Sequence, residues 1–199
     1  MKRFIFPFLC LAFLIGAPTA YHFHQSFHFR NFRVVQEGKL YRSGQLSPAG
    51  LHRIWHEYGI GTIVTLRDDD GLSGVKDAYW EQEYARKQEI VFVRIAPKQW
   101  SDKKAGPPPA AENVRQFLEV LYNPEKYPRP ILIHCFKGSH RTGIYVALYR
   151  MEMDHWSNEA ALEELRRSGY DTLDTDEDIH AFLKQYVPSW KRNDEKQPK

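Results

Sequence analysis

Residues 131–143 read Ile131-Leu-Ile-His-Cys-Phe-Lys-Gly-Ser-His-Arg-Thr-Gly143. An apolar run typical of a buried strand leads into a short polar loop that begins at Cys135 and ends at Arg141. Apolar residues then recur at helical spacing from about Arg141 to Met153. Because a helix N-terminus presents free N–H groups and partial positive charge, this order of strand, loop and helix predicts an anion site.

The loop has the composition of a phosphate site that contains a nucleophile. A cysteine reacts as its thiolate, which a helix N-terminus and a nearby cation stabilise. The planar guanidinium of Arg141 can hold two phosphoryl oxygens at once, which a lysine cannot do. Gly138 permits the tight curvature of the loop, and Thr142 is placed to assist departure of the Cys135 sulfur. The backbone N–H groups expected to wrap the phosphate belong to Phe136, Lys137, Gly138, Ser139, His140 and Arg141.

Apolar periodicity divides the rest of the chain into alternating strands and helices. The pattern predicts a hairpin at 34–43, strands at 62–66 and 90–95, and helices at 47–58, 75–87, 110–122, 157–168 and 175–187. Helices between strands imply parallel pairing. We therefore predict an α/β domain with a central, mostly parallel four- to five-stranded sheet flanked by helices on both faces. Cys135 then lies at the carboxyl end of a strand, where such sheets bind ligands.

Length, charge and spacing exclude other classes of function. The 199 residues suit one catalytic domain, which we expect to be a monomer. A net charge of +3, with basic residues scattered among acidic ones, argues against nucleic acid as a partner. The spacing from Gly138 to Gly143 resembles a nucleotide loop, but Ile144 and Tyr145 stand where lysine and serine or threonine are required.

The N-terminal residues have the pattern of a bacterial-type secretory signal. Basic residues precede an apolar run from Phe4 to Ala17, which is shorter than the roughly 20 residues that span a bilayer. We expect 1–20 to be a signal peptide or an N-terminal anchor, 21–32 a linker, 33–188 the catalytic domain and 189–199 a charged tail. The domain is then expected outside the cytoplasm, periplasmic or secreted, with the inner membrane as a partner if the N-terminus stays attached.

The motif His134-Cys135-x5-Arg141-Thr142 resembles the signature of the cysteine-dependent protein tyrosine and dual-specificity phosphatases. The resemblance extends from Val35 to about Val187 and includes the segments 38–45 and 59–67. Within this family the chain resembles the atypical dual-specificity phosphatases. It implies a phosphatase-type fold and a phosphocysteine intermediate, with neither a metal nor a cofactor.

The resemblance also implies a general acid, because family members carry an aspartate on a mobile loop before the cysteine. Asp102 lies in the proline-containing segment 96–109 after a predicted strand. We expect it to protonate the leaving oxygen and then to activate water. The run Asp68 to Asp70, after a different strand, is the alternative.

The substrate expected from the resemblance is a phosphorylated protein or a small phosphoester. No long insertion builds a deep phosphotyrosine slot, so we expect a shallower pocket that accepts several phosphoesters and not a strict phosphotyrosine site. The function expected is that of a tyrosine or dual-specificity protein phosphatase. Lys137 and His140 make the loop similar to a subgroup that acts on inositol pyrophosphates, from which Ser139 departs because a second lysine is usual there. An inositol polyphosphate or pyrophosphate phosphatase, a non-catalytic phosphate-binding domain and a sulfur-transfer enzyme are the alternatives.

Overall fold

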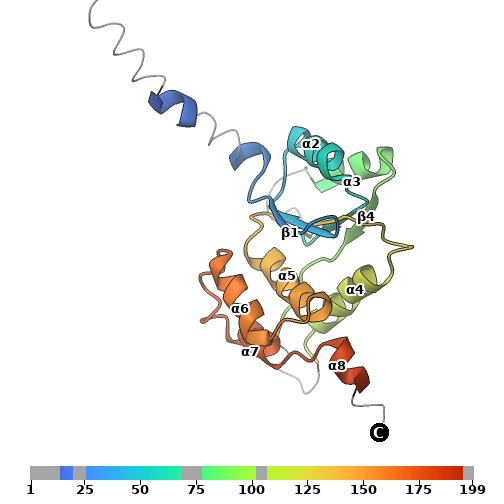
Figure 1. Cartoon of the computed structure of the whole chain (residues 1–199), viewed down its shortest axis with the longest axis vertical. Helices are drawn as coiled ribbons and strands as arrows, with labels where there is room; N and C mark the ends of the chain where they lie inside the picture. Colours follow the sequence, from blue (N-terminus) through green and yellow to red (C-terminus); the bar gives the residue numbers. More distant parts are fainter. Residues whose placement is uncertain (1–13, 20–25, 69–77, 102–106, 195–199) are drawn as a thin grey trace, which may run out of the picture.

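A five-stranded sheet in the order β1-β2-β5-β3-β4 forms the centre of the computed structural model, which describes residues 14–19, 26–68, 78–101 and 107–194 (Figure 1). Its strands are β1 (Arg33–Gln36), β2 (Leu40–Ser43), β3 (Thr62–Thr65), β4 (Val91–Arg94) and β5 (Ile131–His134). β1 and β2 form an antiparallel hairpin, whereas the other neighbours are parallel. The predicted fold class is confirmed, with β5 in the middle of the sheet.

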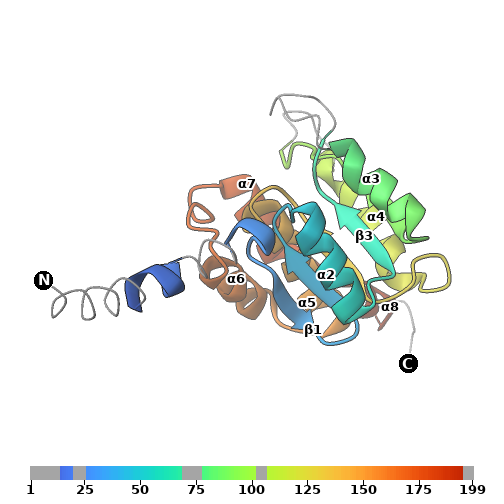
Figure 2. The same ribbon diagram turned by 90° about the horizontal axis from the view of Figure 1, so that it is seen from above.

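Helices cover both faces of this sheet (Figures 1 and 2). α2 (Pro48–Tyr58) and α3 (Ala78–Lys87) lie on one face, and α4 (Ala110–Tyr122) and α5 (His140–Met153) lie on the other. α6 (Asn158–Arg167) packs against α5, and α7 (Glu177–Gln185) packs against α6. Ser47 and Ser157 cap the first turns of α2 and α6, because their hydroxyl groups accept hydrogen bonds from the Gly50 and Ala160 N–H groups.

The two central strands explain why the sequence shows continuous apolar runs. Ile63 and Leu132 belong to the core under α2 and α3, whereas Val64 and Ile133 belong to the core under α4 and α5. All four side chains are fully buried. Burying each contributes about 1.5–3 kcal/mol relative to exposure, so strands covered on both faces need apolar residues at every position.

The C-terminal residues differ from the expected charged tail. Ser189–Asp194 form a short helix, α8. The indole N–H of Trp190 donates to the Met151 carbonyl at 3.0 Å, and the Ser189 N–H donates to Glu152 at 3.1 Å. The sequence pattern misses this helix because one tryptophan, and no repeating apolar face, attaches it to α5.

The segment 26–32, which the sequence assigns to a linker, lies against the domain. His28 Nδ1 lies 2.6 Å from the Ser47 hydroxyl, and the Phe32 ring stacks on Tyr41 with centroids 5.9 Å apart. The Gly44 N–H donates to the Arg30 carbonyl at 2.6 Å. Among the described residues, no helix has the length and apolar character needed to cross a membrane.

Candidate active site

Cys135 follows the last residue of β5 and therefore leaves the sheet at its centre. The residue is buried, with 5% of its surface exposed. The N–H of Gly138 donates to the Cys135 sulfur at 3.2 Å. α5 begins at His140, so the loop closes on a helix N-terminus as the sequence predicts. The thiol thus accepts from one loop N–H and lies near the partially positive end of a helix.

Four consecutive carbonyl groups of the loop are bound from outside. The backbone N–H of Gln45 donates to the Phe136 carbonyl at 3.0 Å, and Asn31 Nδ2 donates to the Lys137 carbonyl at 2.8 Å. Arg42 donates to the Gly138 carbonyl at 2.7 Å and to the Ser139 carbonyl at 3.3 Å. In a trans peptide the C=O and N–H point in opposite directions. Carbonyls held outward therefore turn the following N–H groups inward, toward the place of a phosphate.

Two glycines let the loop pack this closely. Gly138 has a φ of +81°, and a Cβ there would lie 2.5 Å from the Ser43 carbonyl carbon. A side chain at this position would therefore push the loop away from β2. A Cβ at Gly143 would collide with Leu165 of α6, so this glycine brings α5 and α6 together.

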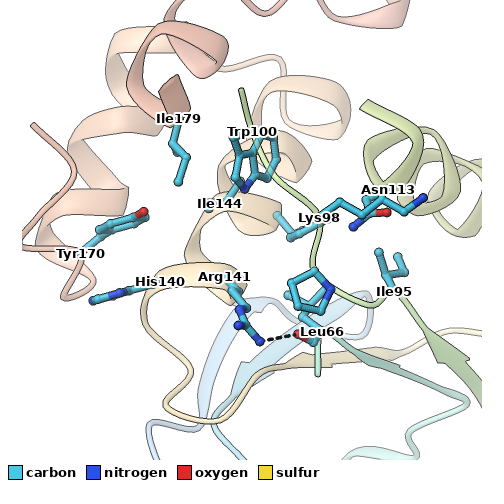
Figure 3. Close-up of a pocket in the computed structure, with 12 residues that line it drawn as sticks. Leu66, Ile95, Lys98, Trp100, Asn113, His140, Arg141, Ile144, Tyr170 and Ile179 are labelled. Atoms are coloured by element: carbon cyan, nitrogen blue, oxygen red, sulfur yellow. Dashed lines mark hydrogen bonds between the residues drawn. The ribbon is translucent and has the colours of Figure 1, made fainter. Parts of the chain in front are cut away.

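Arg141 and Thr142, the other predicted catalytic residues, begin α5. Arg141 Nη1 donates to the Leu66 carbonyl at 3.3 Å and the side chain lines a cavity (Figure 3). Thr142 is fully buried, and its hydroxyl has no hydrogen-bond partner within the described part of the chain. A free hydroxyl beside the loop is compatible with a role at the cysteine sulfur.

Beneath the loop lies a buried polar network that sequence reasoning missed. His134 Nε2 lies 3.0 Å from Glu81 Oε2, and both side chains are at least 96% buried. Gln45 donates to the other carboxylate oxygen of Glu81 at 3.2 Å and accepts from Arg67 at 2.6 Å. α3 thus supplies a carboxylate to the residue that precedes the cysteine. The only available signal was the resemblance over residues 38–45, which includes Arg42 and Gln45 but not Glu81.

The cavity beside the loop has a volume of about 310 Å³ and contains three basic side chains (Figure 3). Lys98, His140 and Arg141 line it, together with aromatic residues that include Trp100 and Tyr170. The His140 ring stacks on Tyr170 with centroids 4.5 Å apart. The cavity therefore offers positive charge and flat apolar walls to an aromatic or polyanionic phosphoester.

Asp102 lies outside the described residues, as do Asp69 and Asp70. Trp100, two residues before Asp102, lines the cavity, whereas Asp68 does not. The residues from Phe136 to Arg141 connect Cys135 to the first turn of α5, and the Gly138 N–H contacts the Cys135 sulfur. Phe136 and Lys137 have exposed side chains.

Residues 25–181 match the model of the family described as "DSP-PTPase phosphatase fused to NAD+ Kinase". The chain belongs to this phosphatase family. Dual specificity protein phosphatase TpbA of Pseudomonas aeruginosa (strain UCBPP-PA14) is 40% identical over 71 residues, which are 35% of this chain and 33% of TpbA. Putative tyrosine-protein phosphatase OCA1 of Mycosarcoma maydis is 29% identical over 137 residues, 69% of this chain and 78% of that protein. The match thus covers about a third of TpbA.

Solved phosphatase structures share the fold. The SIW14 catalytic core superimposes with a TM-score of 0.63 at 20% identity, covering 83% of this chain and 90% of that one. The crystal structure of Pseudomonas aeruginosa TpbA gives a TM-score of 0.54 at 22% identity, covering 79% and 85%. The phosphatase-type fold expected from the sequence is therefore confirmed.

Proposed function

We propose that the protein is a phosphomonoester hydrolase that forms a phosphocysteine at Cys135 and acts on phosphorylated tyrosine, serine or threonine in proteins. One observation carries the proposal: the four carbonyls from Phe136 to Ser139 are bound from outside while the Gly138 N–H meets the Cys135 sulfur. This arrangement gathers N–H groups around a nucleophile at a helix N-terminus, which suits a bound phosphate.

The reaction proceeds in two steps. In the first, the Cys135 thiolate attacks phosphorus, the bond to the leaving oxygen breaks, and Asp102 gives that oxygen a proton. In the second, water attacks phosphorus and gives a proton to the Asp102 carboxylate, and the P–S bond breaks to restore the thiolate. Arg141 and the loop N–H groups stabilise the charge on the phosphoryl oxygens in both steps.

Asp102 is supported by its place in the chain. It follows Trp100, which lines the same cavity as Arg141. A positioned acid contributes about 10² to 10⁴ to the rate. Asp68 follows Arg67, whose guanidinium is directed to Gln45 beneath the loop and not to the cavity.

The test compares three variants on 4-nitrophenyl phosphate and on a phosphotyrosine peptide. Cys135→Ser is expected to abolish turnover of both substrates and to retain vanadate-competable phosphate binding. Asp102→Asn is expected to lower kcat by about 10² to 10⁴ and to remove the basic limb of its pH profile. Asp68→Asn is the control with the same chemical change. Turnover by Cys135→Ser would refute the phosphocysteine step, and a larger loss in Asp68→Asn than in Asp102→Asn would refute the assigned acid.

An inositol pyrophosphate phosphatase is the second candidate. Lys98 adds a second positive charge to the cavity that contains Arg141, which favours a polyanion. Among the relatives, SIW14 of Saccharomyces cerevisiae is described as an inositol diphosphatase and is 40% identical over 53 residues, 27% of this chain and 18% of that protein. A crystal structure of TpbA, in contrast, holds phosphotyrosine. We expect the higher kcat/KM for a phosphotyrosine peptide when it is measured beside a phosphoserine peptide and an inositol pyrophosphate; the reverse order would establish the second candidate.

The N-terminal pattern supports the further proposal that the domain acts outside the cytoplasm. We propose in addition that it is a monomer. The full chain, expressed in bacteria, is expected in the periplasmic fraction or in washed membranes, and to sediment as one copy after extraction. Recovery with cytosolic markers, or as a dimer at micromolar concentration, would contradict this proposal.

A further inference from the structure

The peptide unit between Lys137 and Gly138 is bound on both of its sides. On the inner side its N–H, which belongs to Gly138, donates to the Cys135 sulfur at 3.2 Å. On the outer side its C=O, which belongs to Lys137, accepts from Asn31 Nδ2 at 2.8 Å. Because the peptide is planar, the orientation of the C=O fixes the orientation of the N–H. Asn31 therefore acts on the same peptide plane that faces the cysteine.

Asn31 is the single donor to the Lys137 carbonyl among the described residues, whereas the Phe136 and Ser139 carbonyls have two donors each. The Phe136 carbonyl accepts both from the Gln45 N–H at 3.0 Å and from Arg30 at 3.4 Å. The Ser139 carbonyl accepts from Arg42 and from the Gly143 N–H of α5. Loss of the Asn31 amide thus leaves one specific peptide of the loop without its outer partner.

The segment that contains Asn31 is fixed on the domain. Phe32 N–H donates to the Phe29 carbonyl at 2.7 Å to form a turn, and the Arg30 carbonyl accepts from Gly44 at 2.6 Å. Within this turn Asn31 has a φ of 54°, a left-handed conformation that asparagine and glycine adopt more easily than other residues. The backbone therefore places the amide group before the loop binds it.

We propose that Asn31 is a positioning residue for the phosphate loop. Its amide holds the Lys137 carbonyl outward, so the Gly138 N–H stays directed at the Cys135 sulfur and favours the thiolate. A C=O that accepts a hydrogen bond also makes the N–H of the same peptide a stronger donor. The inference rests on the proposed role of Cys135 as the nucleophile, and it assigns a function to a segment that the sequence places in a linker.

Other charged groups also face the loop and stay the same when Asn31 is changed. Arg42 of β2 is 96% buried and lies under the loop, where it interacts electrostatically with Cys135. His134 of β5 is paired with Glu81 of α3. The remaining groups are Arg30 before β1, Glu164 of α6, Asp171 after α6, Arg67 after β3, Lys98 after β4, Lys137 and His140 in the loop and Arg141 at the start of α5.

The test measures the thiolate of Cys135 directly, in the full chain, with Asn31→Gly as the main variant. Glycine keeps the backbone conformation and removes only the donor. Alkylation of Cys135 by iodoacetamide is followed against pH by mass spectrometry of its peptide, which separates it from Cys10. We expect the alkylation midpoint to move up by about 0.5 to 1 pH unit. Below the wild-type midpoint kcat/KM for 4-nitrophenyl phosphate falls by about 3- to 10-fold, and at high pH the two enzymes converge.

Asn158→Gly is the matched control, because Asn158 also donates from its side chain to backbone carbonyls, those of Leu183 and Tyr186 at 2.8 Å. It is expected to lower the melting temperature and leave the alkylation midpoint in place. Asn31→Asp, which keeps the shape but presents an acceptor, is the second variant and shifts the midpoint in the same direction. An unchanged midpoint in both Asn31 variants, or an equal shift in Asn158→Gly, would overturn the inference. Because alkylation needs no turnover, a chain that fails to hydrolyse any phosphoester refutes the proposed function and leaves this measurement readable.

Discussion

Arg42 binds the underside of the phosphate loop through two carbonyl groups. Burial lowers the pKa of Arg42 to about 10, and nearby Arg33 adds to the effect. The guanidinium therefore keeps its charge at neutral pH. Both bonds come from one nitrogen, Nη2, at the end of a side chain that is longer than that of lysine, so a lysine ammonium falls short of these carbonyls. A residue outside the signature thus controls the direction of the loop peptides.

Arg42→Lys is expected to lower the free energy of unfolding by about 1–3 kcal/mol, because at least one buried carbonyl loses its donor. The kcat/KM for 4-nitrophenyl phosphate is expected to fall by about tenfold, equivalent to about 1.4 kcal/mol. Urea denaturation and steady-state kinetics measure both effects. Arg53→Lys is the control, since Arg53 is exposed and forms an ion pair with Glu57 at 3.4 Å; it should change stability by less than about 0.5 kcal/mol. Equal results for the two variants would contradict the role of Arg42.

At the scale of elements, α3 supports β5 through Glu81. The hydrogen bonds run in one direction, from Arg67 to Gln45 and from Gln45 to Glu81, while His134 contacts the second carboxylate oxygen. Each oxygen of Glu81 therefore faces a nitrogen. Reversing the Gln45 amide would place its NH₂ group against Arg67, so the network has a single arrangement.

Glu81→Gln is expected to destabilise the protein by about 1–3 kcal/mol, because the side chain loses the negative charge that faces His134 and keeps one acceptor oxygen where the carboxylate has two. The kcat/KM falls as well, since His134 adjoins the nucleophile. Thermal unfolding and kinetics are compared with Glu83→Gln, a change on the exposed face of the same helix, where the carboxylate pairs with Arg86 at 2.8 Å. If Glu81→Gln is no more harmful than this control, the network does not support the loop.

Sequence patterns predict the helices and strands better than they predict the contacts between them. The helices 48–58 and 110–122 begin and end close to the predicted residues, because proline, serine and glycine signals act locally. α8 and the partners of the loop carbonyls escape prediction. They depend on residues that are far apart in the chain, such as Asn31 and Lys137, which the folded sheet brings together.

At the scale of the whole molecule, Glu152 joins three segments of the chain. It is almost fully buried in α5 and accepts from Tyr122 of α4 at 2.6 Å. The hydroxyl of Tyr186, the residue that follows α7, also donates to Glu152. So does the Ser189 N–H at the start of α8. One carboxylate therefore holds the C-terminal segment against the two helices that cover the sheet.

This cluster predicts a loss of stability at high pH. Burial and the hydrogen bond to Glu152 raise the pKa of Tyr122 from 10.0 to about 12, and the pKa of Tyr186 is also raised, by burial first and then by the bond to Glu152. A group whose pKa is higher in the folded state than in the unfolded state stabilises the fold at pH values below its unfolded pKa, here about 10. That contribution is lost as the pH rises through the folded pKa. The stability measured by urea should decline between pH 10 and 12. The decline should be shallower in Tyr122→Phe than in the wild type. The difference should be modest, because Tyr122 is half exposed. Parallel plots of unfolding free energy against pH for the two proteins would contradict the assignment.

The sequence by itself determined the chemistry of residues 135–141, the strand before them and the helix after them. Local hydrogen bonding and apolar period specify such features, and they depend on neighbours along the chain. Tertiary structure alone decided that Asn31, Arg42 and Gln45 bind the outward carbonyls and that Glu81 meets His134. The physical reason is that every residue has the same backbone carbonyl, so the sequence does not indicate which group donates to it. The donor is defined only once the sheet has brought distant segments together.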